Sequence, residues 1–159
     1  METKPEQGIH LGGEVFPHRR HVCGFFYSQE EQYDVLLPFI EEGLAQGERA
    51  FHIVDPARRQ EHLTKLRTLR LDTLAAERQG QIEVRVWEEA YLRGGAFSQE
   101  AMLALIEEVL GGPEARQFPL TRLIANMEWA LEDLPGVNDL VEYETRLNFI
   151  LPKYKDPVI

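Results

Sequence analysis

The sequence predicts an α/β protein, a three-layer α/β/α sandwich around a mainly parallel sheet. Short apolar segments alternate at least four times with longer segments whose apolar residues recur at helical spacing. Parallel strands joined by helices satisfy that order, because each crossover helix covers one face of the sheet. The length of 159 residues suits one domain, which we place at residues 1–159, with residues 1–19 as an N-terminal extension.

Five segments are expected to form strands, since each is short and either apolar or alternating between polar and apolar residues. The first, HVCGFFY, is largely apolar, so we expect it to be buried on both faces of the sheet. Its Cys23, the only cysteine, should then be a packed thiol. The last, DPVI, stops at Ile159, which predicts a shortened or missing final strand after residue 157. In order, the segments lie at residues 21–27, 49–55, 81–87, 121–129 and 156–159.

Capping residues mark the starts of the predicted helices. Ser28 and Glu31 fit the capping-box pattern, in which the serine hydroxyl accepts from the third helical amide and the glutamate reaches back to the cap. This helix should bend at Pro38 and end at Gly47. Further helices are predicted after Asp55, Asp72 and Ser98, and a last one carries Leu140, Tyr143, Leu147 and Leu151 on its buried side and ends near Pro152.

Charge and hydropathy argue against several classes of function. A formal net charge of −10 disfavours nucleic acid and anionic membranes as partners, because both require a basic face. The one basic stretch, HRRH at residues 18–21, is interpreted as a solvated loop. No apolar run approaches the roughly 20 residues that span a bilayer. The polar N-terminus lacks the pattern of a secretory signal, so we expect a cytoplasmic protein.

Open parallel sheets bind ligands outside the carboxyl ends of their strands. The turn after residues 21–27 contains neither the glycines nor the lysine of a phosphate-binding loop. Glu30 and Glu31 would also repel a second anion at the positive end of the helix dipole. We therefore expect neither a nucleotide nor another cofactor at this turn.

The sequence lacks the patterns that mark common enzymes. It contains no G-x-S-x-G elbow, and its five histidines show no metal-binding spacing, so we expect neither catalysis nor a metal. His52 is interpreted as a hydrogen-bonded strand residue. Glu88, Glu89 and Glu128 could supply an acid and a base only if the fold brought them together. Solvated carboxylates at a strand end are the simpler interpretation of the first two.

Aromatic residues gather at the predicted strand ends. Trp87, Tyr91 and Phe97 surround Gly94 and Gly95, where the backbone can fold back over the end of a strand. Two interpretations stay open, namely plain core packing or a lidded apolar pocket with a few polar groups. In the second, the ligand-binding residues are Tyr27, Trp87, Tyr91, Phe97, Glu128 and Trp129.

Several motifs, taken in order, resemble those of a known family. HVCGFFYS, LLPFIEEGLAQGERAFHIVD, EEAYLRGGAFS, NMEWALED and LVEYETRLN are similar to the MEDS domain, the sensory domain of methanogen and methylotroph regulators of the DcmR type, from about residue 21 to residue 157. The resemblance implies a RecA/KaiC-like core in which YSQEEQ replaces the phosphate-binding loop. It also implies a sensory role in transcription regulation, with small hydrocarbon derivatives as ligands.

The leading hypothesis is therefore a non-enzymatic cytoplasmic sensory domain for signal transduction, which binds a small, mostly apolar ligand at the carboxyl ends of the strands. Two alternatives stay open. A protein-interaction module would act through a regulatory protein partner without a small-molecule ligand. A residual nucleotide binder or enzyme would use Glu88 and Glu128.

Overall fold

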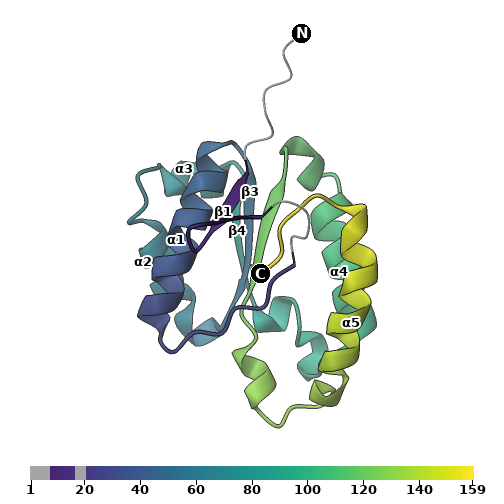
Figure 1. Cartoon of the computed structure of the whole chain (residues 1–159). Coiled ribbons are helices and arrows are strands. Elements are labelled where there is room, and N and C mark those ends of the chain that lie inside the picture. The colour runs from purple at the N-terminus through teal and green to yellow at the C-terminus, as the bar shows by residue number, and fades with distance from the viewer. Residues whose placement is uncertain (1–7, 17–20) are drawn as a thin grey trace.

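The computed structural model describes residues 8–16 and 21–159 of the chain. At its centre lies a parallel three-stranded sheet, ordered β4 (Ile82–Val86), β3 (Arg49–Val54) and β5 (Thr121–Ala125). Helices lie on both sides of this sheet (Figure 1). The predicted α/β class and parallel sheet are thereby confirmed, and all three strands fall inside predicted segments.

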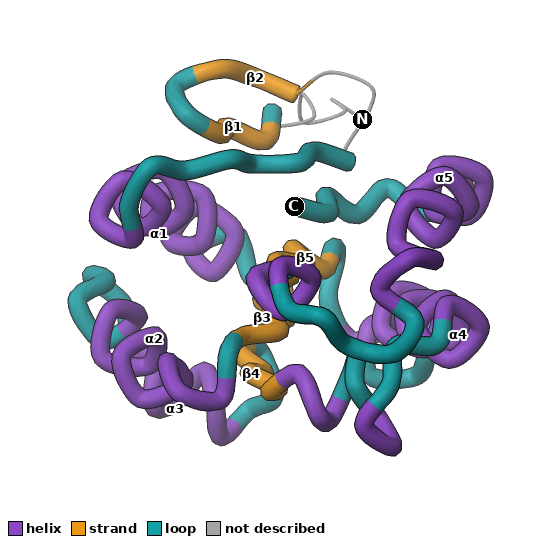
Figure 2. Tube along the Cα trace, turned by 90° about the horizontal axis from the view of Figure 1, so that it is seen from below, coloured by secondary structure: helices purple, strands orange, loops and turns teal. Residues whose placement is uncertain are grey.

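Two groups of helices flank the sheet (Figure 2). One group contains α1 (Gln29–Ala45), α2 (Arg59–Leu66) and α3 (Thr73–Arg78), and the other contains α4 (Gln99–Gly111) and α5 (Leu140–Ile150). Each group encloses its own apolar core against the sheet. Single 3₁₀ turns lie at Pro56–Arg58, Trp87–Glu89, Arg93–Gly95, Ala115–Gln117, Glu128–Leu131, Val137–Asp139 and Leu151–Lys153.

The central strand β3 is buried along its whole length, because it has a strand on each edge and helices over each face. Its register places Ala50 opposite Ile82 of β4 and Arg49 opposite Thr121 of β5. Successive side chains of a strand point to opposite faces. Accordingly Ala50 belongs to the core under α1 and α2, whereas Phe51 belongs to the core under α4 and α5.

The predicted strand at residues 21–27 is not formed. Only His21 makes a bridge, to Val158, which in turn pairs with Leu123 of β5. The expected shortened last strand is thus reduced to a single-residue pairing. Residues 157–159 occupy the edge of β5 instead, because Leu123 N donates to Pro157 O and Ile159 N donates to Leu123 O.

This correction changes the environment of the whole segment. Phe25 and Tyr27 are fully exposed instead of lying inside the sheet. Cys23 is exposed as well, so the prediction of a packed thiol is wrong. An apolar run of this length forms a buried strand only when neighbouring strands accept hydrogen bonds from its amides and donate hydrogen bonds to its carbonyls.

The N-terminal extension contains a hairpin that was not predicted. β1 (Ile9–Leu11) pairs antiparallel with β2 (Glu14–Phe16), and Ile9 is buried in the core beside α1. Gly12 and Gly13 have φ angles of +59° and +86°, as a tight two-residue hairpin turn requires. The basic loop predicted at residues 18–21 lies, apart from His21, outside the described residues.

The helices begin at the predicted caps. The side chains of Ser28, Asp72 and Ser98 each accept a hydrogen bond from the amide three residues further on. Asp55 caps a 3₁₀ turn that continues into α2, and Gly47 follows α1 with a φ of +77°. None of the helices in the described part of the chain has both the length and the apolar character that crossing a bilayer demands.

Candidate ligand-binding site

The carboxyl ends of β3, β4 and β5 meet at one edge of the sheet, because the three strands are parallel. The backbone amide of Asn126, just after β5, donates to Ile53 O at 2.9 Å. Trp87, just after β4, donates from Nε1 to Asn126 O at 3.1 Å. The ends of the two outer strands are therefore tied together across the end of β3.

Four aromatic side chains, Tyr91, Phe97, Trp129 and Tyr143, pack against one another, and we call them the aromatic cluster. The ring centroids of Tyr91 and Phe97 each lie 5.1 Å from that of Trp129. The ring of Tyr143 meets those of Phe97 and Tyr91 edge-on, at 5.3 and 6.3 Å. These separations are typical of favourable aromatic pairs. All four side chains are buried.

The aromatic cluster draws its residues from three parts of the chain. Tyr91 and Phe97 lie on the connection from β4 to α4, Trp129 lies in the 3₁₀ turn after β5, and Tyr143 lies on α5. Gly136 has a φ of +88° and approaches Phe97 so closely that a side chain there would overlap the Phe97 carbonyl oxygen. The loop before α5 is therefore fitted against the connection that carries Phe97.

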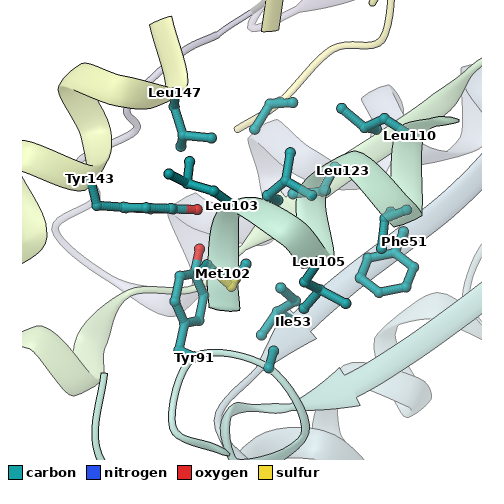
Figure 3. Packing of buried hydrophobic residues seen from close by; sticks show 14 of the residues in the cluster. Phe51, Ile53, Tyr91, Met102, Leu103, Leu105, Leu110, Leu123, Tyr143 and Leu147 are labelled. Atoms are coloured by element: carbon teal, nitrogen blue, oxygen red, sulfur yellow. The ribbon is translucent and has the colours of Figure 1, made fainter. Parts of the chain in front are cut away.

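One polar atom of the cluster, Trp129 Nε1, is buried without a hydrogen-bond partner among the described residues. A buried donor left unpaired costs about 1–3 kcal/mol. The hydroxyl groups of Tyr91 and Tyr143 point toward one another beside Met102 (Figure 3). Burial raises the pKa of both tyrosines well above its usual range, so both hydroxyls keep their protons near neutral pH. The cluster thus presents donors inside an apolar environment.

The fold brings together three of the six predicted ligand-binding residues, namely Tyr91, Phe97 and Trp129. Trp87 belongs to the same apolar core without making a ring pair within the cluster. Tyr143 completes the cluster, although the sequence marked it only as a buried helix residue. Its contribution depends on how α5 packs, which helical periodicity alone does not specify.

The other two predicted residues are placed differently. Glu128 is partly buried, and its Oε2 has no hydrogen-bond partner among the described residues. Tyr27 is not a member of the aromatic cluster, because its side chain is fully exposed. Glu88 and Glu89 are exposed at the end of β4, as the simpler interpretation of these carboxylates expects.

The first turn of α1 is occupied by its own capping side chains. Ser28 Oγ accepts from Glu31 N at 3.1 Å, and Glu31 Oε2 accepts from Tyr27 N at 2.7 Å. This is the predicted capping box, except that the glutamate bonds the residue before the cap. Further along, Gln32 donates to Asn126 Oδ1 at 3.2 Å. Acceptors and carboxylates therefore stand where a phosphate-binding loop presents free amides.

A buried polar chain links α1, α2 and β3. Tyr33 Oη lies 3.1 Å from His62 Nδ1, and His62 Nε2 lies 2.8 Å from His52 Nδ1. Burial lowers the pKa of His62 to about 4 and that of His52 well below its usual value, so both rings are neutral near pH 7. The prediction that His52 is a hydrogen-bonded strand residue is confirmed. His62 was not predicted, although it lies four residues before the buried Leu66 on one face of α2.

An open groove of about 400 Å³ lies between the N-terminal hairpin and α1, with His10, Asp34 and Pro38 in its lining. None of the predicted ligand-binding residues lines it. The groove and the aromatic cluster are therefore separate features of the molecule.

Comparisons with known proteins identify one family. A family model described as "MEDS: MEthanogen/methylotroph, DcmR Sensory domain" matches residues 20–157, which is most of the chain. No curated protein and no solved structure matches the chain. The family match spans β3, β4 and β5, the aromatic cluster and the buried polar chain.

Proposed function

Since the chain belongs to the MEDS family of sensory domains, we propose that it senses a small, mostly apolar molecule that binds within the aromatic cluster. The role is binding and signalling, not catalysis, on a RecA/KaiC-like three-layer fold that lacks a phosphate-binding loop. The observation that carries this proposal is the unpaired buried donor Trp129 Nε1, together with the facing hydroxyl groups of Tyr91 and Tyr143 (Figure 3), among four packed aromatic rings.

The chemistry of the cluster suggests the class of ligand. Aromatic walls favour an apolar body. The Trp129 N–H, and the one O–H that two hydrogen-bonded hydroxyls leave free (Figure 3), favour a hydrogen-bond acceptor such as a carbonyl or ether oxygen. An anionic ligand is disfavoured, because the nearby Glu144 already raises the pKa of both Tyr91 and Tyr143 beyond the effect of burial. The proposed ligand is therefore a neutral small molecule with a single acceptor.

Binding in the cluster requires local opening, because its side chains are almost completely buried. The connection at residues 87–97 is the proposed moving element, with Gly94 and Gly95 at φ angles of +75° and +82°. The second element is α5, which supplies Tyr143. A ligand transmits a signal only when it binds two arrangements with different affinity. We propose that the two arrangements differ in the distance between this connection and α5.

Docking of a regulatory protein is a second candidate function, favoured by exposed apolar side chains on α5. Val141 and Phe149 are both largely exposed, and their i, i+8 spacing is one that recurs along a single stripe of a helix. Tyr143 and Leu147 of the same helix are buried in the core. A partner on the exposed face would therefore contact the helix that completes the aromatic cluster.

Cyclohexanone and cyclohexane form a matched pair of probes for the proposed site, because only cyclohexanone has a hydrogen-bond acceptor. We expect cyclohexanone to raise the melting temperature by mass action and to change the fluorescence of Trp87 and Trp129, the only tryptophans. Tyr143→Phe removes one donor and keeps the ring. It should weaken cyclohexanone binding roughly 2- to 10-fold, since a hydrogen bond contributes about 0.5–1.5 kcal/mol.

Tyr27→Phe is the control, because it removes a hydroxyl from a fully exposed tyrosine. If the Tyr27→Phe and Tyr143→Phe variants bound cyclohexanone with equal affinity, the ligand would bind outside the aromatic cluster. Stabilisation by ATP with magnesium would support the nucleotide-binding alternative instead. A third outcome is that no small molecule stabilises the chain, while wild type captures a regulatory protein and the Phe149→Asp variant does not. The docking function would then replace the ligand-binding one.

A further inference from the structure

Three side chains with metal-binding atoms meet where the segment before α1 passes α5. A ring nitrogen of His21, the Sγ of Cys23 and a carboxylate oxygen of Glu144 all lie within 4.8 Å of one another. Cys23 is exposed, whereas His21 and Glu144 are partly buried. The group is thus open to an ion from solvent on one side and backed by protein on the other.

The spacing of two of these groups fits tetrahedral coordination. His21 Nε2 lies 3.4 Å from Glu144 Oε2. Ligand atoms around a tetrahedral Zn²⁺ with bonds of about 2.0–2.1 Å are separated by about 3.3–3.4 Å. The separation of these two atoms therefore matches that of two ligands of one tetrahedral ion. The Sγ of Cys23 lies within 4.8 Å of a ring nitrogen of His21 and a carboxylate oxygen of Glu144, and is the candidate for the third ligand.

The ring of His21 is oriented by a residue outside this group. Asn148 Nδ2 donates to Glu144 O at 3.2 Å, so Asn148 Oδ1 is the atom that faces the ring, 3.2 Å from His21 Nδ1. An amide oxygen only accepts, which makes Nδ1 the donor and leaves Nε2 facing the carboxylate. Metal-ligating histidines usually donate their second N–H to an oxygen in this way.

Two fixed elements hold the donors in place. His21 bridges Val158 at the edge of the sheet, and Val22 N donates to Val158 O at 2.9 Å. Glu144 is in the middle of α5, the helix whose Tyr143 packs in the aromatic cluster. The sheet edge and α5 therefore hold two of the three donors, His21 and Glu144.

From this geometry we propose that His21, Cys23 and Glu144 bind one divalent metal ion of the Zn²⁺ class. Imidazole, thiolate and carboxylate together suit Zn²⁺, whereas Mg²⁺ and Ca²⁺ prefer oxygen donors alone. Three protein donors leave the fourth tetrahedral position open for water or a small molecule. The bound ion would also fasten the segment before α1 to α5.

Titration of the untagged chain with Co²⁺ tests this site directly, because tetrahedral Co²⁺ absorbs visible light and reports its ligands. Cys23 is the only cysteine, so a thiolate-to-cobalt charge-transfer band can arise only from its sulfur. We expect this band and the visible tetrahedral bands to saturate together at one ion per chain. Added Zn²⁺ should abolish both by displacing Co²⁺.

Variants separate the proposed ligands from their neighbours. Cys23→Ser should remove the charge-transfer band and weaken Zn²⁺ binding at least about 100-fold, since even outer-shell changes cost 10–100-fold. Glu144→Gln should also weaken binding, whereas Glu142→Gln, which removes the same charge from another face of α5, should not. Failure of wild type to give a saturable cobalt spectrum, or equal Zn²⁺ affinity in Glu142→Gln and Cys23→Ser, would overturn the proposal. The three side chains would then be a protonated histidine paired with a glutamate beside a free thiol.

Discussion

His52, His62 and Tyr33 show how burial fixes the protonation state of single residues. Burial keeps both histidines neutral by lowering their pKa, to about 4 for His62. Burial also raises the pKa of Tyr33 to about 12, with nearby Glu61 adding to the shift. Because burial penalises a charge in this core, ionising any of the three groups lowers the free energy of unfolding.

Folding stability should therefore fall in acid. An unfolded histidine has a pKa of about 6.5, so below that pH the unfolded state takes up protons that folded His62 accepts only near pH 4. Each such histidine removes up to about 1.4 kcal/mol per pH unit from the free energy of unfolding in this window. Urea unfolding at stepped pH measures the slope. His62→Gln keeps a polar group that does not titrate, so its slope should be shallower, and an unchanged slope would contradict the neutral assignment.

The start of α1 depends on one hydroxyl, that of Ser28. Ser28→Ala removes the acceptor of the Glu31 amide and should lower the free energy of unfolding by about 1 kcal/mol. Ser28→Thr, which keeps a hydroxyl, should recover most of that loss in urea unfolding. If Ser28→Ala instead kept full stability and lost cyclohexanone binding, the serine would be a ligand-binding residue and not a structural cap.

The elements that could be predicted are those whose signals are local. Ser28, Asp72 and Ser98 start helices because a cap acts on amides within three residues, which the sequence displays directly. Residues 21–27 were predicted wrongly because a strand also needs a neighbour, and only His21 finds one. The capping signal at the start of α1 was correct even though the strand before it was not.

The candidate sites likewise divide into residues whose meeting follows from local signals and residues whose meeting depends on how distant segments pack. Tyr91, Phe97 and Trp129 could be predicted to meet, because parallel strands bring their carboxyl ends to one edge and these residues follow β4 and β5. Tyr143 could not, since nothing local to α5 specifies which core it enters. The His21, Cys23 and Glu144 group was missed for the same reason, because its donors come from opposite ends of the chain and show no motif spacing.

One ion-pair network joins α1 to the sheet. Arg122 of β5 is almost fully buried, and its Nε donates to Glu48 Oε2 at 2.5 Å. Its Nη1 donates to Phe39 O at 2.7 Å and to Glu42 Oε2 at 2.8 Å. The guanidinium also lies 4.6 Å from the centroid of the Phe39 ring. One side chain thus satisfies two carboxylates and a helix carbonyl, and no local pattern in the sequence marks it.

Loss of Arg122 should destabilise the whole molecule, because Glu48 would remain buried as a charge without its partner. Arg122→Met should lower the free energy of unfolding by about 3–5 kcal/mol, the range for breaking one side of a buried pair. The double variant Arg122→Met with Glu48→Gln removes the stranded charge and should be more stable than Arg122→Met alone. Urea unfolding of wild type, both single variants and the double variant gives the coupling energy. If the losses in the free energy of unfolding of the two single variants simply added in the double variant, the stability would come from packing of the arginine stem and not from its pairing with Glu48.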